Sequence, residues 1–162
     1  MVLQRVKSAS VTVDGNLVAS IGKGVLALAA VSKDDTIKDS EQSAAKLLKV
    51  RLWDDEAGGR WKRNVQEIGG EVLCVSQFTL LASTKKGKPD FHRAAGLEKG
   101  KELYSAFFRK VQELYDKDKV KDGVFQAMMD VALINDGPVG VDYSSEDGVV
   151  MPLSVFGPRL RC

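Results

Sequence analysis

The chain holds few of the residues that build disulfide frameworks, metal sites or catalytic triads. It has two cysteines, Cys74 and Cys162, and one histidine, His92, among 162 residues. Two cysteines without a C-x-x-C pair exclude a disulfide framework and a zinc site, so both are interpreted as reduced thiols. There is no G-x-S-x-G elbow and no Walker phosphate loop, so a serine-histidine triad would depend on His92 alone. We interpret His92, in a polar loop, as a surface or supporting group instead of a base.

Long apolar runs, an excess of one charge and a cluster of metal ligands are also missing. No stretch approaches the ~18 apolar residues of a membrane span, and the N-terminus lacks the apolar core of a signal peptide. We therefore expect the cytosol as the compartment and no membrane partner. Basic and acidic residues, 24 and 22, leave a net charge of +2, which does not indicate a nucleic-acid-binding domain. The acids at 54–56 lie in a glycine-rich turn without a histidine, so we predict a solvated turn and no metal.

Basic residues do gather locally in the second half of the chain. Lys85, Lys86 and Lys88 lie in the loop TKKGKPDFHR, with Arg93 just beyond. The pattern fits a solvated loop as well as a loop that contacts phosphates, and both interpretations stay open.

The residues that are present predict one ordinary domain over 1–162. Hydrophobic residues make up 44% of the chain, enough for a core without disulfide or metal staples. Alternation over 2–13, a D-G-N turn and the run LVASI predict a β-hairpin. The unbroken apolar run 25–31 predicts a central strand covered on both faces.

Two segments have the periodicity of amphipathic helices, near 40–52 and 97–116. Asp39 or Ser40 is predicted to cap the first helix. Its apolar stripe is predicted to contain Ala44, Leu47, Leu48 and Leu52. The second helix carries Leu103, Phe107, Val111 and Leu114 on one face, with Tyr104, Phe108 and Tyr115 beside them. The runs VLCVSQFTLL, VFQAMMDVALIND and VGVDY predict further strands, so we expect an α+β fold with two layers of antiparallel or mixed strands and two helices on one side.

Two polar segments interrupt this pattern. SQFTL, at 76–80, puts polar residues in an apolar strand, where each unpartnered buried group would cost about 1–3 kcal/mol. NDGPVG, at 135–140, consists of residues that favour turns. Each has an ordinary explanation, because a strand side chain can bond a neighbouring backbone and a turn needs no function.

Together, and in this order, SQFTL and NDGPV resemble the two signature motifs of the D-aminoacyl-tRNA deacylase family. LQRVKSASVTVDG, GGEVLCVSQFTL, TKKGKPDFH and FQAMMDVALINDGPV are similar to successive parts of that family, so the resemblance covers nearly the whole chain. It implies a homodimeric enzyme without a cofactor. The implied substrate is aminoacyl-tRNA, in which the enzyme hydrolyses the ester joining a D-amino acid, or glycine, to the terminal adenosine.

The resemblance also implies how handedness is read. In the family the Gly-Pro bond is cis and reaches into the partner subunit's site, and the matching residues here are Gly137 and Pro138. A cis bond before proline costs only about 0.5–1 kcal/mol, so such a corner is feasible. Its backbone carbonyls would accept the substrate ammonium group and leave no room for an L side chain. Arg5 is expected to pair near this corner.

The same resemblance assigns roles to the polar strand end. Gln77 and backbone N–H groups would orient the ester carbonyl beside Ser76, with Phe78 as a wall. Thr79 is a candidate nucleophile, but no adjacent base is evident, so hydrolysis assisted by the 2′-OH of the terminal ribose is favoured. The remaining predicted contacts are Phe125, Met128 and Met129, which offer apolar faces to the adenine or, alternatively, belong to the core.

One departure from the family pattern and two alternative functions remain. Gly140 stands where the family commonly has threonine, so any side-chain contact made there is lost. A noncatalytic nucleic-acid-binding module of the same fold would not need Gly137 and Pro138. A hydrolase of free esters is the other alternative.

Overall fold

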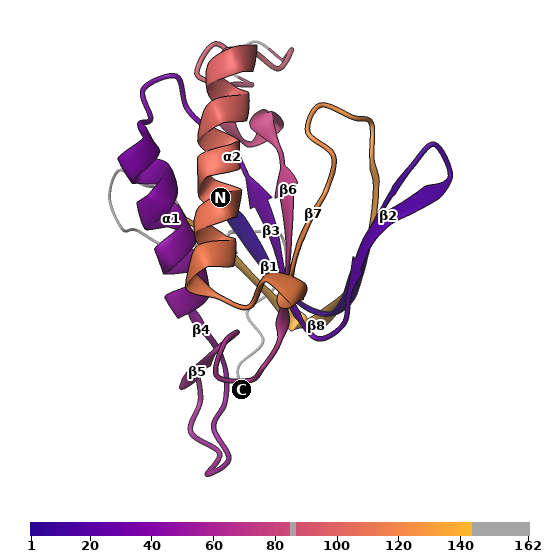
Figure 1. The fold of residues 1–162 in the computed structure, drawn as a ribbon, viewed down its shortest axis with the longest axis vertical. Helices are drawn as coiled ribbons and strands as arrows, with labels where there is room; N and C mark the ends of the chain where they lie inside the picture. The colour runs from indigo at the N-terminus through magenta and orange to yellow at the C-terminus, as the bar shows by residue number, and fades with distance from the viewer. Residues whose placement is uncertain (85–86, 144–162) are drawn as a thin grey trace.

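The fold is described by a computed structural model that covers residues 1–84 and 87–143 (Figure 1). Its elements, in chain order, are β1 (Val2–Val13), β2 (Asn16–Ile21), β3 (Gly24–Ala29), α1 (Ile37–Lys49), β4 (Arg51–Trp53), β5 (Arg63–Asn64), β6 (Glu71–Ser76), the 3-10 helix η1 (Phe78–Leu81), α2 (Leu97–Leu114), the 3-10 helix η2 (Lys117–Lys119), β7 (Val120–Asp122) and β8 (Asp130–Asp142). The fold is α+β, as predicted.

The main sheet is mixed and has the order β2-β1-β3-β6-β7, with β8 paired to β1. The strand β1 runs antiparallel to β2, β3 and β8, whereas β3, β6 and β7 are parallel to one another. The predicted hairpin and the central position of β3 are confirmed. The strand β3 ends at Ala29, however, two residues before the end of the predicted run.

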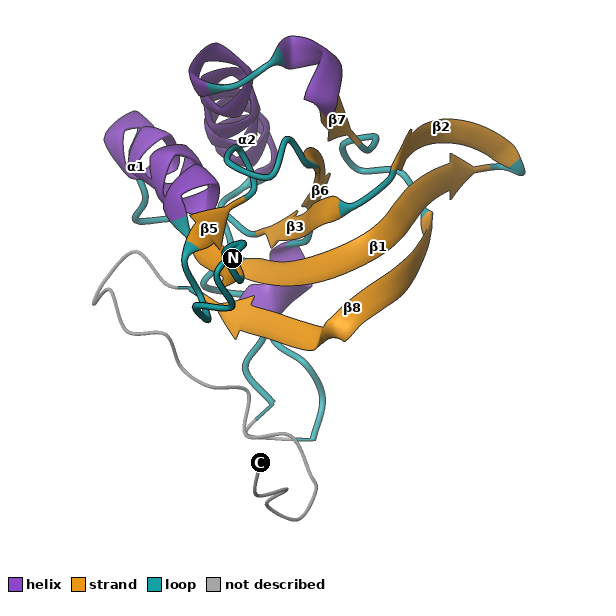
Figure 2. Cartoon of the chain, turned by 90° about the horizontal axis from the view of Figure 1, so that it is seen from below, coloured by secondary structure: helices purple, strands orange, loops and turns teal. Residues whose placement is uncertain are grey.

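Both faces of the central strands are covered, which explains their unbroken apolar sequence. Along β3, Val25 and Ala27 face the core under the helices, while Leu26 faces a second core. Successive side chains on a strand point to opposite faces, so each core takes alternate residues. The second core is built from buried residues of β1, β2, β3 and β6 on the face of the sheet away from the helix-side core. Figure 2 shows α1 and α2 together on the other side.

The first helix begins one turn earlier than the sequence predicted. Thr36, not Asp39 or Ser40, is its N-cap residue. The Asp39 carboxylate accepts from the Thr36 N–H at 2.8 Å and from its hydroxyl at 2.6 Å, which is the return half of a capping box. The acid therefore belongs three residues inside the helix, where it also complements the helix dipole.

Three other expectations about the elements are wrong. Leu52 is buried but lies in β4, not on the stripe of α1. Residues 78–81, predicted as the end of a strand, form the 3-10 helix η1 instead. Residues 124–129 form a loop, so the last strand begins only at Asp130. Within the described ranges, no helix is long and apolar enough to cross a membrane.

Candidate active site

The strand β6 ends at Ser76, and the polar residues after it leave the sheet. Residues 72–75 are buried, whereas Ser76 is half-buried. The Gln77 N–H donates to the Ala29 carbonyl at 2.7 Å, and η1 begins at the next residue. Ser76, Gln77 and Thr79 are therefore polar because they stand at the open end of a core strand, not inside it.

The residues of η1 are arranged by a few local contacts. The Leu80 N–H donates to the Gln77 carbonyl at 3.2 Å. The Gln77 carboxamide donates to the hydroxyl oxygen of Thr79. Phe78 is 57% exposed, and its ring meets the ring of Phe91 edge-on, with centroids 5.1 Å apart. The first N–H groups of a helix have no acceptor within it, so those of Phe78 and Thr79 are open to an outside acceptor.

A cavity of about 670 Å³ lies against this strand end. Its other walls come from the start of α2 and from the loop between β7 and β8. The predicted site residues that line it are Ser76, Gln77, Phe78, Thr79, Phe125, Met128 and Met129. They meet because β6 and β7 are parallel, with Cys74 opposite Asp122, so the segments after both strands leave the sheet at the same end.

The three residues predicted to contact the adenine differ in exposure and packing. Met128 is 92% exposed and offers free apolar surface. The Phe125 ring lies 5.8 Å from that of Tyr104 and packs against the helix-side core. The Met129 sulfur accepts from the Val124 N–H at 3.3 Å, and its side chain packs against the second core. Phe125 and Met129 therefore combine a core role with a place in the cavity wall.

Tyr104 is the only ionisable side chain among the described residues that line the cavity. Its hydroxyl donates to Oδ1 of Asp122 at 2.5 Å. Burial raises the pKa of Tyr104 far above its ordinary range, and the nearby Cys74 and Asp122 add to the effect. A phenol in this state cannot act as a base near neutral pH. The cavity can bind and orient a substrate, but its described walls supply no general base.

Gly137 and Pro138 lie outside this cavity, on the exposed strand β8. Their peptide bond is cis, as predicted. Arg5 pairs with Val139 and Val6 with Asn135, so residues 136–138 bulge out of the ladder instead of forming the end of a strand. Gly137 has a φ of +129°, and an added Cβ would lie 2.9 Å from Val139 Cγ2, so only glycine fits.

Arg5 holds the base of this bulge, near the Gly-Pro corner, as predicted from the sequence. Its Nε lies 3.4 Å from the Asp136 carboxylate and donates to the Asp136 carbonyl at 2.9 Å. Nη1 donates to the Leu52 carbonyl in β4. The guanidinium also lies 5.9 Å from the centre of the Trp61 ring. One side chain therefore ties the bulge to β4 and to the loop before β5.

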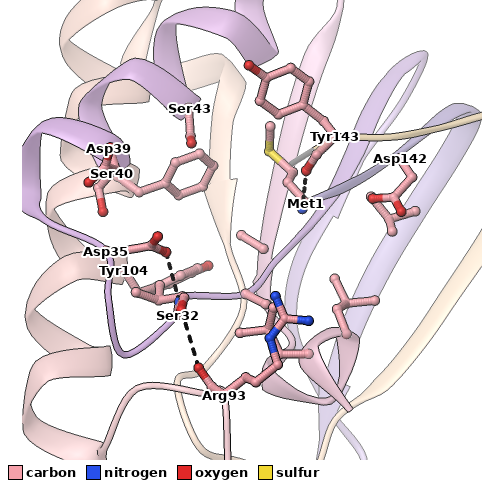
Figure 3. Close-up of a pocket in the computed structure, with 17 residues that line it drawn as sticks. Met1, Ser32, Asp35, Asp39, Ser40, Ser43, Arg93, Tyr104, Asp142 and Tyr143 are labelled. Carbon is pink, nitrogen blue, oxygen red and sulfur yellow. Dashed lines mark hydrogen bonds between the residues drawn. The ribbon is translucent and has the colours of Figure 1, made fainter. Parts of the chain in front are cut away.

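A second cavity, of about 280 Å³, shares the Tyr104 wall with the first (Figure 3). Leu80, Leu81 and Tyr104 face it, together with several charged groups. One of these charged groups is the N-terminal ammonium of Met1, which donates to the Tyr143 carbonyl at 2.7 Å. Burial lowers the pKa of this ammonium group. None of the predicted site residues lines this cavity, so the larger one is the candidate active site.

The other candidate groups of the sequence are not at the cavity. The His92 side chain is 59% exposed, and its Nδ1 lies 2.9 Å from the Asp90 carboxylate. Hydrogen bonds from the His92 backbone and ring lower the pKa of Asp90. Asp55 accepts from the Ala57 and Gly59 N–H groups, which is the turn role predicted for it. Within 1–84 and 87–143, no group of three metal-ligating side chains is found.

Two polar lining residues were not predicted from the sequence, Tyr104 and Gln126. The spacing of Tyr104 placed it beside the apolar face of α2, which is correct but does not indicate a cavity. Nothing in the local sequence singles out Gln126. Its backbone, with a φ of +65°, is the signal that marks it, and that signal exists only in the structure.

A mostly apolar cavity whose described walls carry one ionisable group, the buried phenol of Tyr104, is suited to binding and orienting a ligand. Residues 2–143 match the model of the family described as D-Tyr-tRNA(Tyr) deacylase, and the chain therefore belongs to that family. The resemblance carried by SQFTL and NDGPV is thereby confirmed.

Curated relatives agree with this assignment along the whole fold. The D-aminoacyl-tRNA deacylase of Yarrowia lipolytica is 51% identical over 149 residues, which cover 90% of this chain and 97% of that protein. The Saccharomyces cerevisiae D-aminoacyl-tRNA deacylase is 44% identical over 147 residues, with coverage of 90% and 98%.

Solved structures share the fold. The c-Myc DNA Unwinding Element Binding Protein superposes with a TM-score of 0.83 at 42% identity, over 86% of this chain and 93% of that one. A structure of a probable eukaryotic D-amino acid tRNA deacylase superposes with a TM-score of 0.73 at 18% identity, over 86% and 95%, which supports the fold alone.

Proposed function

We propose that this deacylase acts as a homodimer of single-domain subunits, over residues 1–162, that hydrolyses the ester bond of D-aminoacyl-tRNA. Glycyl-tRNA mischarged on tRNA(Ala) is a second substrate in this proposal, because glycine has no side chain to exclude. The products are the free amino acid and tRNA. Each subunit contributes the strand-end cavity, and its partner contributes the Gly137–Pro138 corner.

The observation that carries the proposal is the separation of the two signature segments within one chain. Ser76 to Thr79 line the cavity, whereas Gly137 and Pro138 are exposed and do not. Val131 lines the cavity and Val139 lies just beyond the corner, and their partners on β1 are six residues apart, or roughly 20 Å of strand. The corner of a subunit does not line its own cavity, and in this proposal it enters the cavity of the partner.

The surface next to the corner suits a symmetric contact between two subunits. Ile134 is 60% exposed on β8. In a two-fold dimer both subunits present the same surface, so the Ile134 side chain of each subunit would be buried in the contact. Burial of large apolar side chains at the centre of an interface is where most of its stability arises.

Handedness would be read by exclusion at the inserted corner. Backbone carbonyls of the partner's bulge accept hydrogen bonds from the substrate ammonium group and fix the position of its Cα. A D side chain then points away from the corner, and an L side chain collides with it. A clash with rigid backbone discriminates more strongly than a modest attraction to the correct isomer.

Hydrolysis would rely on orientation by the protein and on the substrate's own hydroxyl. The N–H groups of Phe78 and Thr79, at the start of η1, receive the developing oxyanion of the ester carbonyl. The Thr79 hydroxyl accepts from Gln77 and has no base beside it in the described cavity walls, so in this proposal it acts as a donor and not as a nucleophile. With no base in the described walls, the 2′-OH of the terminal ribose positions the attacking water.

The test compares matched D-, L- and glycyl-tRNA substrates with the wild type and with Pro138→Ala. We expect the wild type to hydrolyse the D and glycyl esters and to spare the L ester, and Pro138→Ala to lose D-ester hydrolysis without unfolding. Pro89→Ala, at an exposed loop proline, is the matched control and should behave as the wild type. Equal cleavage of both isomers by the wild type would refute exclusion at the corner.

Two further measurements separate the parts of the proposal. Light scattering should give the mass of a dimer, and a monomer that keeps full activity would refute the shared site. A tRNA ending in 2′-deoxyadenosine, charged at its 3′-OH, should bind normally and turn over slowly. Normal turnover of this substrate would rule out a role for the 2′-OH.

A noncatalytic nucleic-acid-binding module is the second candidate, because the structural neighbour at 42% identity is described as binding a DNA unwinding element. In this chain the exposed Lys88 and Arg93 would carry the contact with phosphates. Binding of DNA or RNA without turnover of any D-ester would favour this candidate. For the deacylase we expect a weak salt dependence, corresponding to few phosphates.

A further inference from the structure

The loop between β7 and β8 contains a turn with an unusual backbone. The Ala127 N–H donates to the Val124 carbonyl at 3.2 Å, which closes a four-residue turn around Phe125 and Gln126. Gln126 has a φ of +65°. A positive φ at the third position of a turn is normally supplied by glycine or asparagine, because other side chains crowd their own backbone there. A glutamine at this position therefore calls for a reason.

The other non-glycine residues with positive φ have such reasons within the fold. Asp14, with a φ of 49°, precedes Gly15 in the tight turn of the first hairpin, where both central residues need positive φ. Trp61, with a φ of 57°, lies against Arg5 and donates its N–H to Asp54 at 3.2 Å. The Gln126 carboxamide, by contrast, makes no hydrogen bond with another residue of the described chain. Its side chain therefore adds nothing evident to the fold.

The position of Gln126 in the cavity supplies a different reason. The residue is exposed and lines the 670 Å³ cavity between Phe125 and Ala127. The exposed Met128 is two residues further on. A carboxamide has one acceptor oxygen and an amino group with two donors. Strained backbone that the fold does not require is most often kept where it aims a side chain at a ligand.

We propose that Gln126 reads the edge of the terminal adenine of the tRNA substrate, an inference that rests on the deacylase function proposed above. Its Oε1 accepts from the adenine N6 amino group, and its Nε2 donates to the adjacent ring nitrogen N7. This pairing of a carboxamide with adenine is the one that suits both groups. Met128 and Phe125 cover the apolar faces of the base, so the turn provides a face contact and an edge contact together.

The pairing makes the site selective for the base as well as for the amino acid. Purine riboside, which lacks the N6 amino group, can form only the bond to N7. Guanine presents acceptors at both O6 and N7, so the carboxamide can satisfy only one of them. Both replacements should weaken binding without touching the ester or the D side chain.

The test uses amides, which do not hydrolyse, of D-tyrosine with 3′-amino-3′-deoxyadenosine and with the matching purine riboside. We expect the wild type to bind the adenosine compound about tenfold more tightly, the discrimination that a bidentate contact provides. Gln126→Gly should bind both compounds equally, and more weakly than the wild type binds purine riboside, because the wild type still makes the bond to N7 of that compound. Gln126→Asn, whose carboxamide is one methylene shorter, should lose most of the preference while tolerating the same backbone.

The outcomes separate this inference from the proposed function. Equal wild-type affinities for the two compounds, or an unchanged preference in Gln126→Gly, would overturn the role of Gln126. Because binding of the amides needs no hydrolysis, the ratio decides the matter even if no D-ester is turned over, a result that would count against the proposed function alone. Gln126→Gly should be at least as stable as the wild type to urea, since glycine suits the backbone, whereas a structural role predicts lower stability.

Discussion

The guanidinium of Arg5 donates from Nε to the carbonyl of Asp136 at 2.9 Å, so the first strand of the chain fixes the bulge in the last. The same side chain donates to the Leu52 carbonyl and lies beside the Asp136 carboxylate. Its side chain is only 16% exposed. The cis corner at Gly137–Pro138 is thus held from beneath by a charged group with at least two backbone partners.

Replacing Arg5 should cost both stability and activity. Arg5→Ala leaves the Asp136 and Leu52 carbonyls without their donor, and hydrogen bonds to charged groups contribute about 1.5–3 kcal/mol. We expect the free energy of unfolding in urea to fall by about 2 kcal/mol, and D-ester hydrolysis to fall further, because the corner loses its orientation. Arg51→Ala is the matched control, since Arg51 is exposed in β4, and should stay within about 0.5 kcal/mol of the wild type. Full activity of Arg5→Ala would contradict this role.

Local periodicity was enough to predict the elements that build the frame. The hairpin of β1 and β2, the buried β3 and both helices follow from patterns that each span fewer than about 20 residues. The errors lie at the ends of elements, where a nearby partner decides. Thr36 caps α1 because Asp39 can reach back to it, and Leu52 leaves the helical stripe because the chain pairs as β4.

The site was predictable in its parts but not in its assembly. SQFTL and FQAMM are about 50 residues apart, and only the parallel pairing of β6 with β7 brings their ends to one cavity. The bulge at 136–138 depends on register with a strand at the other end of the chain. Gln126 carries no local signal at all, because a positive φ is a property of the folded turn and not of the residue type.

Two glycines in the sheet should respond oppositely to a larger residue. An added Cβ at Gly140 would lie 3.2 Å from Oε1 of Gln4, the far end of a flexible side chain. Gly140→Thr, which restores the residue common in the family, should therefore raise the free energy of unfolding by about 0.5–1 kcal/mol, because threonine favours strands and glycine does not.

Gly24 is the contrasting position. A Cβ there would lie 1.8 Å from the backbone carbonyl oxygen of Glu71, its partner in the pairing of β3 with β6. Gly24→Ala cannot be accommodated without separating the two central strands, and it should cost at least about 3 kcal/mol. Urea denaturation of both variants checks the pair of predictions. A tolerated Gly24→Ala would show that the β3–β6 register is wrong. A strongly destabilised Gly140→Thr would show that the β1–β8 register is wrong.

Asp122 should make the stability of the protein depend on pH in an unusual direction. Its carboxylate accepts a hydrogen bond from the Tyr104 hydroxyl at the back of the cavity, and burial raises its pKa above the ordinary value of a carboxyl group. A carboxyl with a raised pKa binds more protons in the folded state than in the unfolded state, so it lowers stability as pH rises from the ordinary carboxyl pKa to the raised one. Above that window the cost is fully present.

Asp122→Asn removes the charge while keeping an oxygen that accepts from Tyr104. We expect the difference in unfolding free energy between Asp122→Asn and the wild type to grow in favour of the variant across this window and then to become constant. Urea denaturation at a series of pH values starting near 4 measures it. Asp34→Asn, at an exposed residue, should follow the wild-type profile. Parallel profiles of Asp122→Asn and the wild type over the whole range would mean that burial does not raise the pKa of Asp122. The Tyr104 wall of the cavity would then be more open to water than its burial indicates.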